Sequence, residues 1–287
     1  MQLEFGLFCV LLATGAVRSA SLEDAKCGYI SEEELLRQNN FAVPTEHQWL
    51  ARIMYKNGHE TKLPNDGCLG VLISPRNVLA PAHCFLLYDG RANAYSVQLG
   101  VWNKTSKANE ADCATDGYCV MPAQEIPIVG VAIHPEYDPV SLKHSLAVLT
   151  LKRDASRTTN VMPVCMPPSS SLHETLVGQL FVVAGLPTNS ELKHKTWVHT
   201  ISRPYCQEKH GTLVTNNHTV CGYQDRMKMY YVGAPLVGIQ VSSDEPQYFY
   251  LVGLLLDSKK VDDKELIVAS YLDVRPYIGF INRNAEF

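Results

Sequence analysis

The stretch Val78-Leu79-Ala80-Pro81-Ala82-His83-Cys84 decides how the rest of the chain is interpreted. A short apolar run leads into a histidine that stands between an alanine and a cysteine, and this cysteine follows Cys68 by sixteen positions. Short apolar runs bounded by turn residues are typical of buried β-strands. Taken alone, the stretch fits a core or turn histidine beside a disulfide, so the surrounding sequence must show whether His83 has a chemical role.

Outward from this stretch, the chain is a succession of short apolar runs separated by Gly, Pro, Asn and Asp. Helical spacing of apolar residues is found only near residues 32–36 and 272–280. Many short strands over about 240 residues indicate barrels or a sandwich. We therefore predict an all-β chain with a C-terminal helix and strands near residues 49–54, 71–80, 94–101, 126–133, 146–151, 179–184, 248–256 and 266–270.

The cysteines indicate the compartment. The chain of 287 residues has nine, and the first, Cys9, lies in an apolar segment that is too short to span a bilayer but is typical of a signal peptide. We expect residues 1–20 to be removed on export, which leaves eight cysteines. An even set in an exported chain predicts four disulfides.

Charge and hydropathy exclude two classes of protein. Lys and Arg number 25 against 29 Asp and Glu, a net charge of −4, and no basic run is present, so a nucleic-acid binder is not expected. Beyond the N-terminal segment, no stretch has the roughly 18 apolar residues of a membrane helix. The sequons at Asn103 and Asn217 agree with export and would mark surface loops if glycosylated.

Four further motifs occur in the chain together with the stretch around His83. They are Trp49, Ile133-His134-Pro135-Glu136-Tyr137, Gly233-Ala234-Pro235-Leu236-Val237 and Tyr271-Leu272-Asp273-Val274-Arg275-Pro276-Tyr277-Ile278. In this order and spacing, from about Cys27 to Asn284, the chain resembles the chymotrypsin-like serine proteases. The resemblance implies two antiparallel six-stranded β-barrels, an active cleft between them and a C-terminal α-helix.

Cys27 and the closely spaced Cys113 and Cys119 are similar to features of the arthropod clip-domain group, although no clip domain is visible. The resemblance implies a light-chain-like segment at residues 21–37, tethered by Cys27, and a protease homologue domain at residues 38–287. Cleavage after Arg37 by a trypsin-like enzyme is chemically possible. The implied disulfides are Cys27–Cys165, Cys68–Cys84, Cys113–Cys119 and Cys206–Cys221.

The catalytic positions depart from the family pattern. A serine protease needs a nucleophilic hydroxyl, a histidine base and an aspartate that stabilises the imidazolium. By resemblance His83 is the base, Ser145 stands where the aspartate belongs, and Val232 stands where the nucleophilic serine belongs. Valine has no heteroatom that a base can activate, so the resemblance implies a pseudoprotease.

The supporting positions depart as well. Tyr230 replaces the glycine whose N–H helps to bind the oxyanion, and its side chain is expected to crowd that hole. Tyr231 replaces the aspartate that receives the new N-terminal ammonium after zymogen cleavage, so Gln38, exposed by cleavage after Arg37, would find no carboxylate. The specificity pocket has Arg226 at its base, with Asp225 as the alternative in a shifted register, and Leu256, Asp257 and Ser258 along its wall.

The other polar motifs are interpreted as structural or surface features rather than as functional sites. The ten histidines show no His-x-x-x-His spacing, so we expect no metal and no cofactor. Lys193-His194-Lys195 and Lys259-Lys260 are interpreted as small basic spots on loops, and too few for an anion site. Residues 32–34 are glutamates that cap a short helix, with Ser31 as N-cap and Glu34 completing a capping box.

Three functions follow from these patterns. The favoured one is a secreted, catalytically inactive serine protease homologue that regulates extracellular protease cascades of innate immunity, of the melanisation type. Its partners would be cascade proteases, zymogens or prophenoloxidase-like targets in a haemolymph-like fluid. The alternatives are an active trypsin-like endopeptidase with a displaced nucleophile, for which Ser145 is at the wrong corner of the triad, and an adhesive module or a decoy that binds protease inhibitors.

Overall fold

A computed structural model describes most of the chain that follows the predicted signal segment. Residues 1–20, Gln38, Asp225 and Arg226, all named above, lie outside the described residues. The described residues are 26–35, 37, 41–56, 67–87, 90–91, 94–108, 110–113, 119–224, 229–261 and 266–287.

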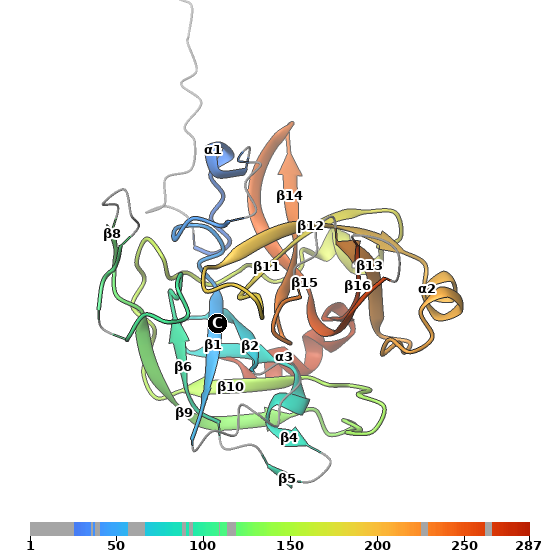
Figure 1. Ribbon diagram of the computed structural model, residues 1–287, viewed down its shortest axis with the longest axis horizontal. Coiled ribbons are helices and arrows are strands. Elements are labelled where there is room, and N and C mark those ends of the chain that lie inside the picture. The colour runs from blue at the N-terminus through green and yellow to red at the C-terminus, as the bar shows by residue number, and fades with distance from the viewer. Residues whose placement is uncertain are drawn as a thin grey trace, which may run out of the picture.

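Two closed antiparallel barrels of six strands each make up the fold, which confirms the architecture implied by the resemblance (Figure 1). The first closes in the order β1-β2-β3-β10-β9-β6 and the second in the order β11-β12-β13-β16-β15-β14. The first barrel consists of β1 (Leu50–Tyr55), β2 (Leu69–Ser74), β3 (Asn77–Ala80), β6 (Ala94–Leu99), β9 (Gln124–Ile133) and β10 (Ala147–Leu151). The second consists of β11 (Leu180–Gly185), β12 (His194–Ile201), β13 (Thr219–Gln224), β14 (Pro235–Ser242), β15 (Glu245–Lys260) and β16 (Ile267–Asp273).

The predicted strands are found where apolar runs are continuous. β2 and β3 are buried along their whole length, and the predicted run 71–80 divides between them at a turn where Ser74 pairs with Asn77. The additional strands are β12, β13 and β14, and two short hairpins outside the barrels. These hairpins are β4 (Leu86–Leu87) with β5 (Gly90–Arg91), and β7 (Asp112–Cys113) with β8 (Cys119–Val120).

Helices are short and lie at the edges of the barrels. α1 (Glu32–Leu35) begins as predicted at Ser31, whose hydroxyl accepts from the Glu34 N–H at 3.4 Å, but the Glu34 carboxylate bonds to the Thr45 hydroxyl outside the helix. The other helices of the described residues are η3 (Ala82–Cys84), η4 (Ser169–His173), α2 (Arg203–Lys209), η5 (Arg275–Tyr277) and α3 (Ile278–Asn284). α3 confirms the predicted C-terminal helix, although Leu272, assigned to its periodicity, belongs to β16.

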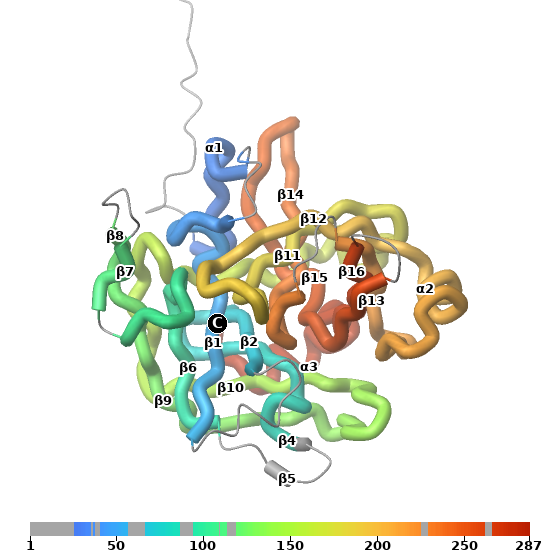
Figure 2. The backbone as a smooth tube through the Cα atoms, in the orientation of Figure 1, coloured from blue at the N-terminus to red at the C-terminus, as the bar shows by residue number. Residues whose placement is uncertain are grey.

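Four disulfides join the same cysteines that the resemblance pairs: Cys27–Cys165, Cys68–Cys84, Cys113–Cys119 and Cys206–Cys221. The first fastens the N-terminal segment to the body of the protein. Gly28 continues this attachment, because its N–H donates to Pro163 O and its carbonyl accepts from the Phe249 N–H, each at 2.8 Å. Figure 2 shows this segment, in blue, beside the hairpin of β14 and β15. Native disulfides of this kind contribute about 2–4 kcal/mol each.

A buried ionic cluster holds the following segment against β12, which corrects the interpretation of 193–195 as an exposed basic spot. The Lys193 side chain is only 2% exposed, and its ammonium donates to the carbonyls of Pro44 and Glu46. Burial lowers the pKa of Lys193 to about 8. Lys195 forms an ion pair with the Glu46 carboxylate. The second basic pair was also misplaced, because Lys259 and Lys260 end β15 rather than lying in a loop.

Candidate functional site

His83 lies in η3, directly after β3, with its ring beside Ser145. The His83 Nδ1 is 2.9 Å from the Ser145 hydroxyl, and the His83 backbone N–H donates to the same oxygen at 3.3 Å. Ser145 is fully buried and precedes β10, which pairs with β3 and so brings the two residues together across 62 positions of sequence. Ser145 therefore contacts the imidazole at the atom where an active protease has its aspartate.

The imidazole is held in the neutral form. His83 is only 3% exposed, and burial lowers its pKa to about 4. Its Nε2, the atom that would accept the nucleophile's proton, has no hydrogen-bond partner among the described residues. A serine hydroxyl orients the ring but carries no charge to stabilise an imidazolium.

Val232 is part of the hydrophobic core next to this histidine. Its backbone pairs with Cys68 in a parallel bridge, and its carbonyl accepts from the Leu69 N–H at 2.7 Å. The disulfide from Cys68 leads to Cys84, the neighbour of His83. The Val232 side chain is 1% exposed and packs in the same cluster as these cysteines. A hydrocarbon therefore fills the position that the resemblance assigns to the nucleophile.

Gly233 fixes the backbone at this point. Its φ of +87° is in the region that favours glycine, and a Cβ would lie 1.9 Å from Leu69 O. The backbone therefore requires the glycine that the resemblance places directly after the nucleophile, while the residue before this glycine, Val232, has no nucleophilic atom.

Tyr230 is a buried side chain of the second core cluster. It is fully buried in the cluster that includes Val183, Leu236 and Tyr271, and a Cβ on Gly185 would lie 3.0 Å from its ring. Burial raises the pKa of Tyr230, and its hydroxyl has no partner among the described residues. The phenol acts as a core side chain, and the crowding of an oxyanion hole stays a prediction.

Tyr231, which the resemblance places where active members have the ammonium-binding aspartate, is buried. Its N–H donates to Leu186 O at 3.1 Å. The Lys104 ammonium lies 5.4 Å from the centre of the Tyr231 ring and donates to Pro187 O at 3.1 Å. The Tyr231 side chain therefore interacts with a cation through its ring and has no carboxylate to offer to a new N-terminus.

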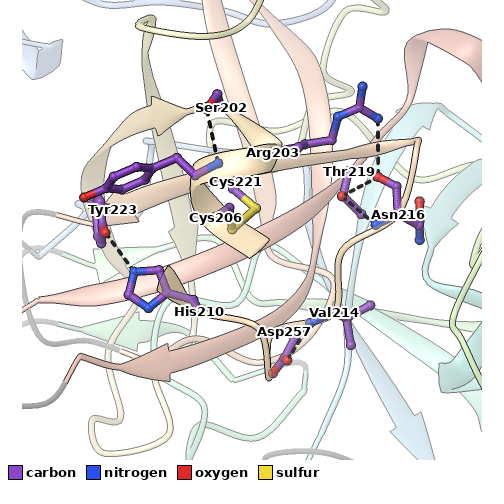
Figure 3. Close-up of a disulfide and its surroundings, with 11 residues drawn as sticks. Ser202, Arg203, Cys206, His210, Val214, Asn216, Thr219, Cys221, Tyr223 and Asp257 are labelled. Carbon is purple, nitrogen blue, oxygen red and sulfur yellow. Dashed lines mark hydrogen bonds between the residues drawn. A yellow bond between two sulfur atoms is a disulfide. The ribbon is translucent and has the colours of Figure 1, made fainter. Parts of the chain in front are cut away.

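The segment predicted as pocket wall is bonded to a neighbouring loop. Asp257 accepts from the Val214 N–H at 3.2 Å through one carboxylate oxygen, as Figure 3 shows beside the Cys206–Cys221 disulfide. Leu256 is 2% and Ser258 4% exposed, and the Ser258 hydroxyl has no partner among the described residues. Leu256 and Ser258 are therefore buried, whereas the Asp257 side chain is 25% exposed and bonds to the backbone of the neighbouring loop.

The predicted modification sites differ in accessibility. Arg37 is exposed just after α1, within reach of a protease. Asn217 is exposed, while the hydroxyl of Thr219 in its sequon exchanges bonds with the backbone of Asn216 (Figure 3). Asn103 is half-buried, and its Oδ1 accepts from the N–H and hydroxyl of Thr105.

A second cluster of polar side chains, which the sequence reasoning missed, lies on the loop between β9 and β10. His134, Glu136 and His144 bring one ligand atom each within 4.8 Å of one another. The residues fall in a hairpin loop, so helical spacing motifs do not detect them; pairing of the runs 126–133 and 146–151 would have done so.

Comparison with known proteins agrees with this geometry. The family described as Trypsin matches residues 37–230. The chain belongs to the trypsin family. Phenoloxidase-activating factor 3 of Holotrichia diomphalia is 28% identical over 93% of this chain and 77% of its own length. CLIP domain-containing serine protease HP8 of Bombyx mori is 31% identical over 62% of this chain.

This trypsin-family chain spans 50% of the length of the Bombyx protein. Among solved structures, the Drosophila Grass clip serine protease of the Toll pathway superposes with a TM-score of 0.68 at 19% identity, covering 89% of this chain and 73% of the other. At that identity the likeness supports the fold alone. Together with the disulfides, these matches show a chymotrypsin-like homologue of the arthropod clip-domain proteases.

Proposed function

We propose that this protein is a secreted, catalytically inactive member of the trypsin family that regulates extracellular protease cascades by binding. The observation that carries the proposal is the environment of His83. Its Nε2 is buried and has no hydrogen-bond partner in the described part of the chain, and the core cluster that contains the neighbouring Cys84 also contains Val232, to which the resemblance assigns the nucleophile's position. In subtilisin, loss of the serine hydroxyl alone costs on the order of 10⁶ in kcat.

The regulatory role is supported by the relatives. Their names include phenoloxidase-activating factors 1 and 3 and the Spaetzle-processing enzyme of Drosophila melanogaster. A protein that keeps this fold and its disulfides but has altered catalytic positions can bind such proteases without cleaving peptide bonds itself. The partners proposed are cascade proteases, their zymogens or prophenoloxidase-like targets.

Export is part of the proposal. Four disulfides persist only in oxidising compartments, and no helix in the described part of the chain is long and apolar enough to cross a membrane. We propose removal of residues 1–20 and division at Arg37 into a light-chain-like segment and the domain from residue 38. Asn217, which is exposed, is the preferred glycosylation site over Asn103.

Inactivity is tested with the secreted chain, before and after trypsin treatment, using a fluorophosphonate probe and mixed chromogenic peptides. We expect no labelled serine and no turnover above a heat-inactivated sample. The matched variants are Val232→Ser and Val232→Ser with Ser145→Asp. The single variant should remain silent because Tyr230 and Tyr231 still replace supporting groups, and labelling of the unmodified chain would refute the proposal.

Regulation is tested separately, with a clip-domain protease zymogen and its activating protease. We expect the added chain to change the rate of zymogen cleavage in a saturable way, and the Val232→Ser variant to act equally. An unchanged rate across zymogens of the phenoloxidase and Toll types would favour the adhesive or decoy function instead.

A further inference from the structure

The loop between β9 and β10 gathers three metal-ligating side chains at one point. His134 follows the last residue of β9, Glu136 comes two residues later, and His144 stands three residues before β10. The nitrogen or carboxylate atoms that they offer all lie within 4.8 Å of one another. Tetrahedral coordination at 2.0–2.2 Å needs ligand atoms about 3.4 Å apart, so small side-chain rotations complete the site.

The backbone of this loop is fixed on both sides. The His134 N–H donates to Leu146 O at 2.9 Å and its carbonyl accepts from the Tyr137 N–H at 3.0 Å. His144 has a φ of +53°, a left-handed conformation that few residues other than glycine adopt, that histidine adopts more often than most, and that clusters at functional sites. Two ligands are thus presented from the base of a hairpin rather than from a free loop.

His144 also has the outer contact that metal-binding histidines require. Its Nδ1 lies 3.1 Å from the hydroxyl of Tyr277, which is itself 3% exposed, so its Nε2 remains available for a metal. On His134, Nδ1 accepts from the Glu136 N–H at 3.3 Å. This hydrogen bond is long, so a metal at Nδ1 can displace it, and a metal at Nε2 would leave it in place.

Rings from three other elements of the chain lie around the group. His218, directly before β13, lies 5.2 Å from the His144 ring, and Tyr277 of η5 and Phe280 of α3 lie 5.3 and 4.9 Å from the His134 ring, measured between centres. Such a shell limits access of water to one side. The Glu136 side chain is exposed, so a metal can enter from solvent.

We propose that His134, Glu136 and His144 form a binding site for a divalent transition metal, with Zn²⁺ as the ion that the donor set fits best. Two imidazoles and one carboxylate suit Zn²⁺, Cu²⁺ or Ni²⁺, whereas Ca²⁺ and Mg²⁺ prefer oxygen ligands throughout. Three protein ligands leave a fourth position for water. The bound ion links the two ends of the β9–β10 loop, which also carries Ser145. This replaces the expectation, drawn from spacing, that the histidines bind no metal.

The test is a Zn²⁺ titration of the complete secreted chain by calorimetry, with thermal unfolding as a second readout. We expect one equivalent with a Kd of about 1 μM or tighter and a rise in Tm with Zn²⁺. Glu136→Gln, an exposed change that leaves the fold intact, should weaken binding at least tenfold, and His144→Asn should remove the equivalent. Tyr277→Phe should weaken binding about 10–100-fold through the lost contact to His144.

Two matched controls separate this site from others. His173→Asn removes an exposed histidine elsewhere and should leave the titration unchanged. His83→Asn should also keep the equivalent, because the proposed ion does not touch the His83 ring. Unchanged binding in Glu136→Gln and His144→Asn, or no binding by the unmodified chain, would overturn the proposal, and neither outcome bears on catalytic inactivity.

Discussion

Acidification is predicted to destabilise the protein through His83. The imidazole is buried and neutral, with its pKa lowered from 6.5 to about 4, whereas in the unfolded chain it titrates at its ordinary value. Between these pH values His83 binds a proton in the unfolded state but not in the folded state. The free energy of unfolding is therefore highest above pH 6.5 and falls as the pH drops towards 4. At 1.36 kcal/mol per unit, the loss is about 2 kcal/mol at pH 5.

The assay compares urea unfolding at pH 7.5 and pH 5.0 for the unmodified chain and for His83→Asn, whose amide occupies the place of Nδ1 beside Ser145 but does not titrate. Buried His47, whose pKa burial also lowers, contributes equally to both proteins and cancels. We expect the unmodified chain to lose about 2 kcal/mol more than the variant over this interval. His173→Asn, an exposed change, should behave like the unmodified chain.

Equal losses in the unmodified chain and in His83→Asn would refute the reasoning. That result would mean that the imidazole is protonated in the folded state near pH 6, and hence that water or an anion reaches it. The proposal of a sealed, neutral catalytic position would then fail at its central residue.

Two further predictions concern the N-terminal segment. Trypsin should cleave first after Arg37, which is exposed. The N-terminal fragment should separate from the main chain only on reducing gels, because the Cys27–Cys165 disulfide holds it, and separation without reductant would contradict that pairing. Glu46→Gln should cost about 3 kcal/mol in urea unfolding, because it removes the carboxylate that is paired with Lys195, whose side chain is only 13% exposed. A further Lys195→Met change should recover part of the loss, and a loss below about 0.5 kcal/mol for the single change would show that the pair is solvated.

Strands were predictable where the sequence contains an apolar run, whether the strand is fully buried, as β2 and β3 are, or largely half-exposed, as β9 is. β2, β3 and β10 are apolar along most of their length and lie where the runs indicate them. β12 was missed because its inward positions include His194 and Thr196, so its sequence lacks an apolar run although its burial alternates. A polar inward face is stabilised by partners from distant segments, and those partners cannot be read from local sequence.

The candidate site, like the fold, could be predicted from the sequence only in part. The identities of the residues at the catalytic positions follow from motif order, and His83 and Ser145 are found in contact. The direction of the Tyr230 ring does not follow from the motif, because it depends on space in the second barrel beside Gly185. The loop histidines were dismissed because spacing rules describe helices, whereas a hairpin brings residues ten positions apart to one place.

Ser145 and Val232, which the resemblance assigns to two catalytic positions, form a consistent pair in electrostatic terms. In an active protease the buried aspartate holds the neutral imidazole in place and stabilises the imidazolium that forms when the nucleophile delivers its proton to Nε2. Val232 has no proton to deliver, so the imidazolium does not form by that route and needs no countercharge. The neutral imidazole needs only a hydrogen-bond partner at Nδ1, and the Ser145 hydroxyl supplies one at 2.9 Å without a buried charge. Serine at 145 is therefore compatible with valine at 232, and either catalytic group restored alone would lack the group with which it acts.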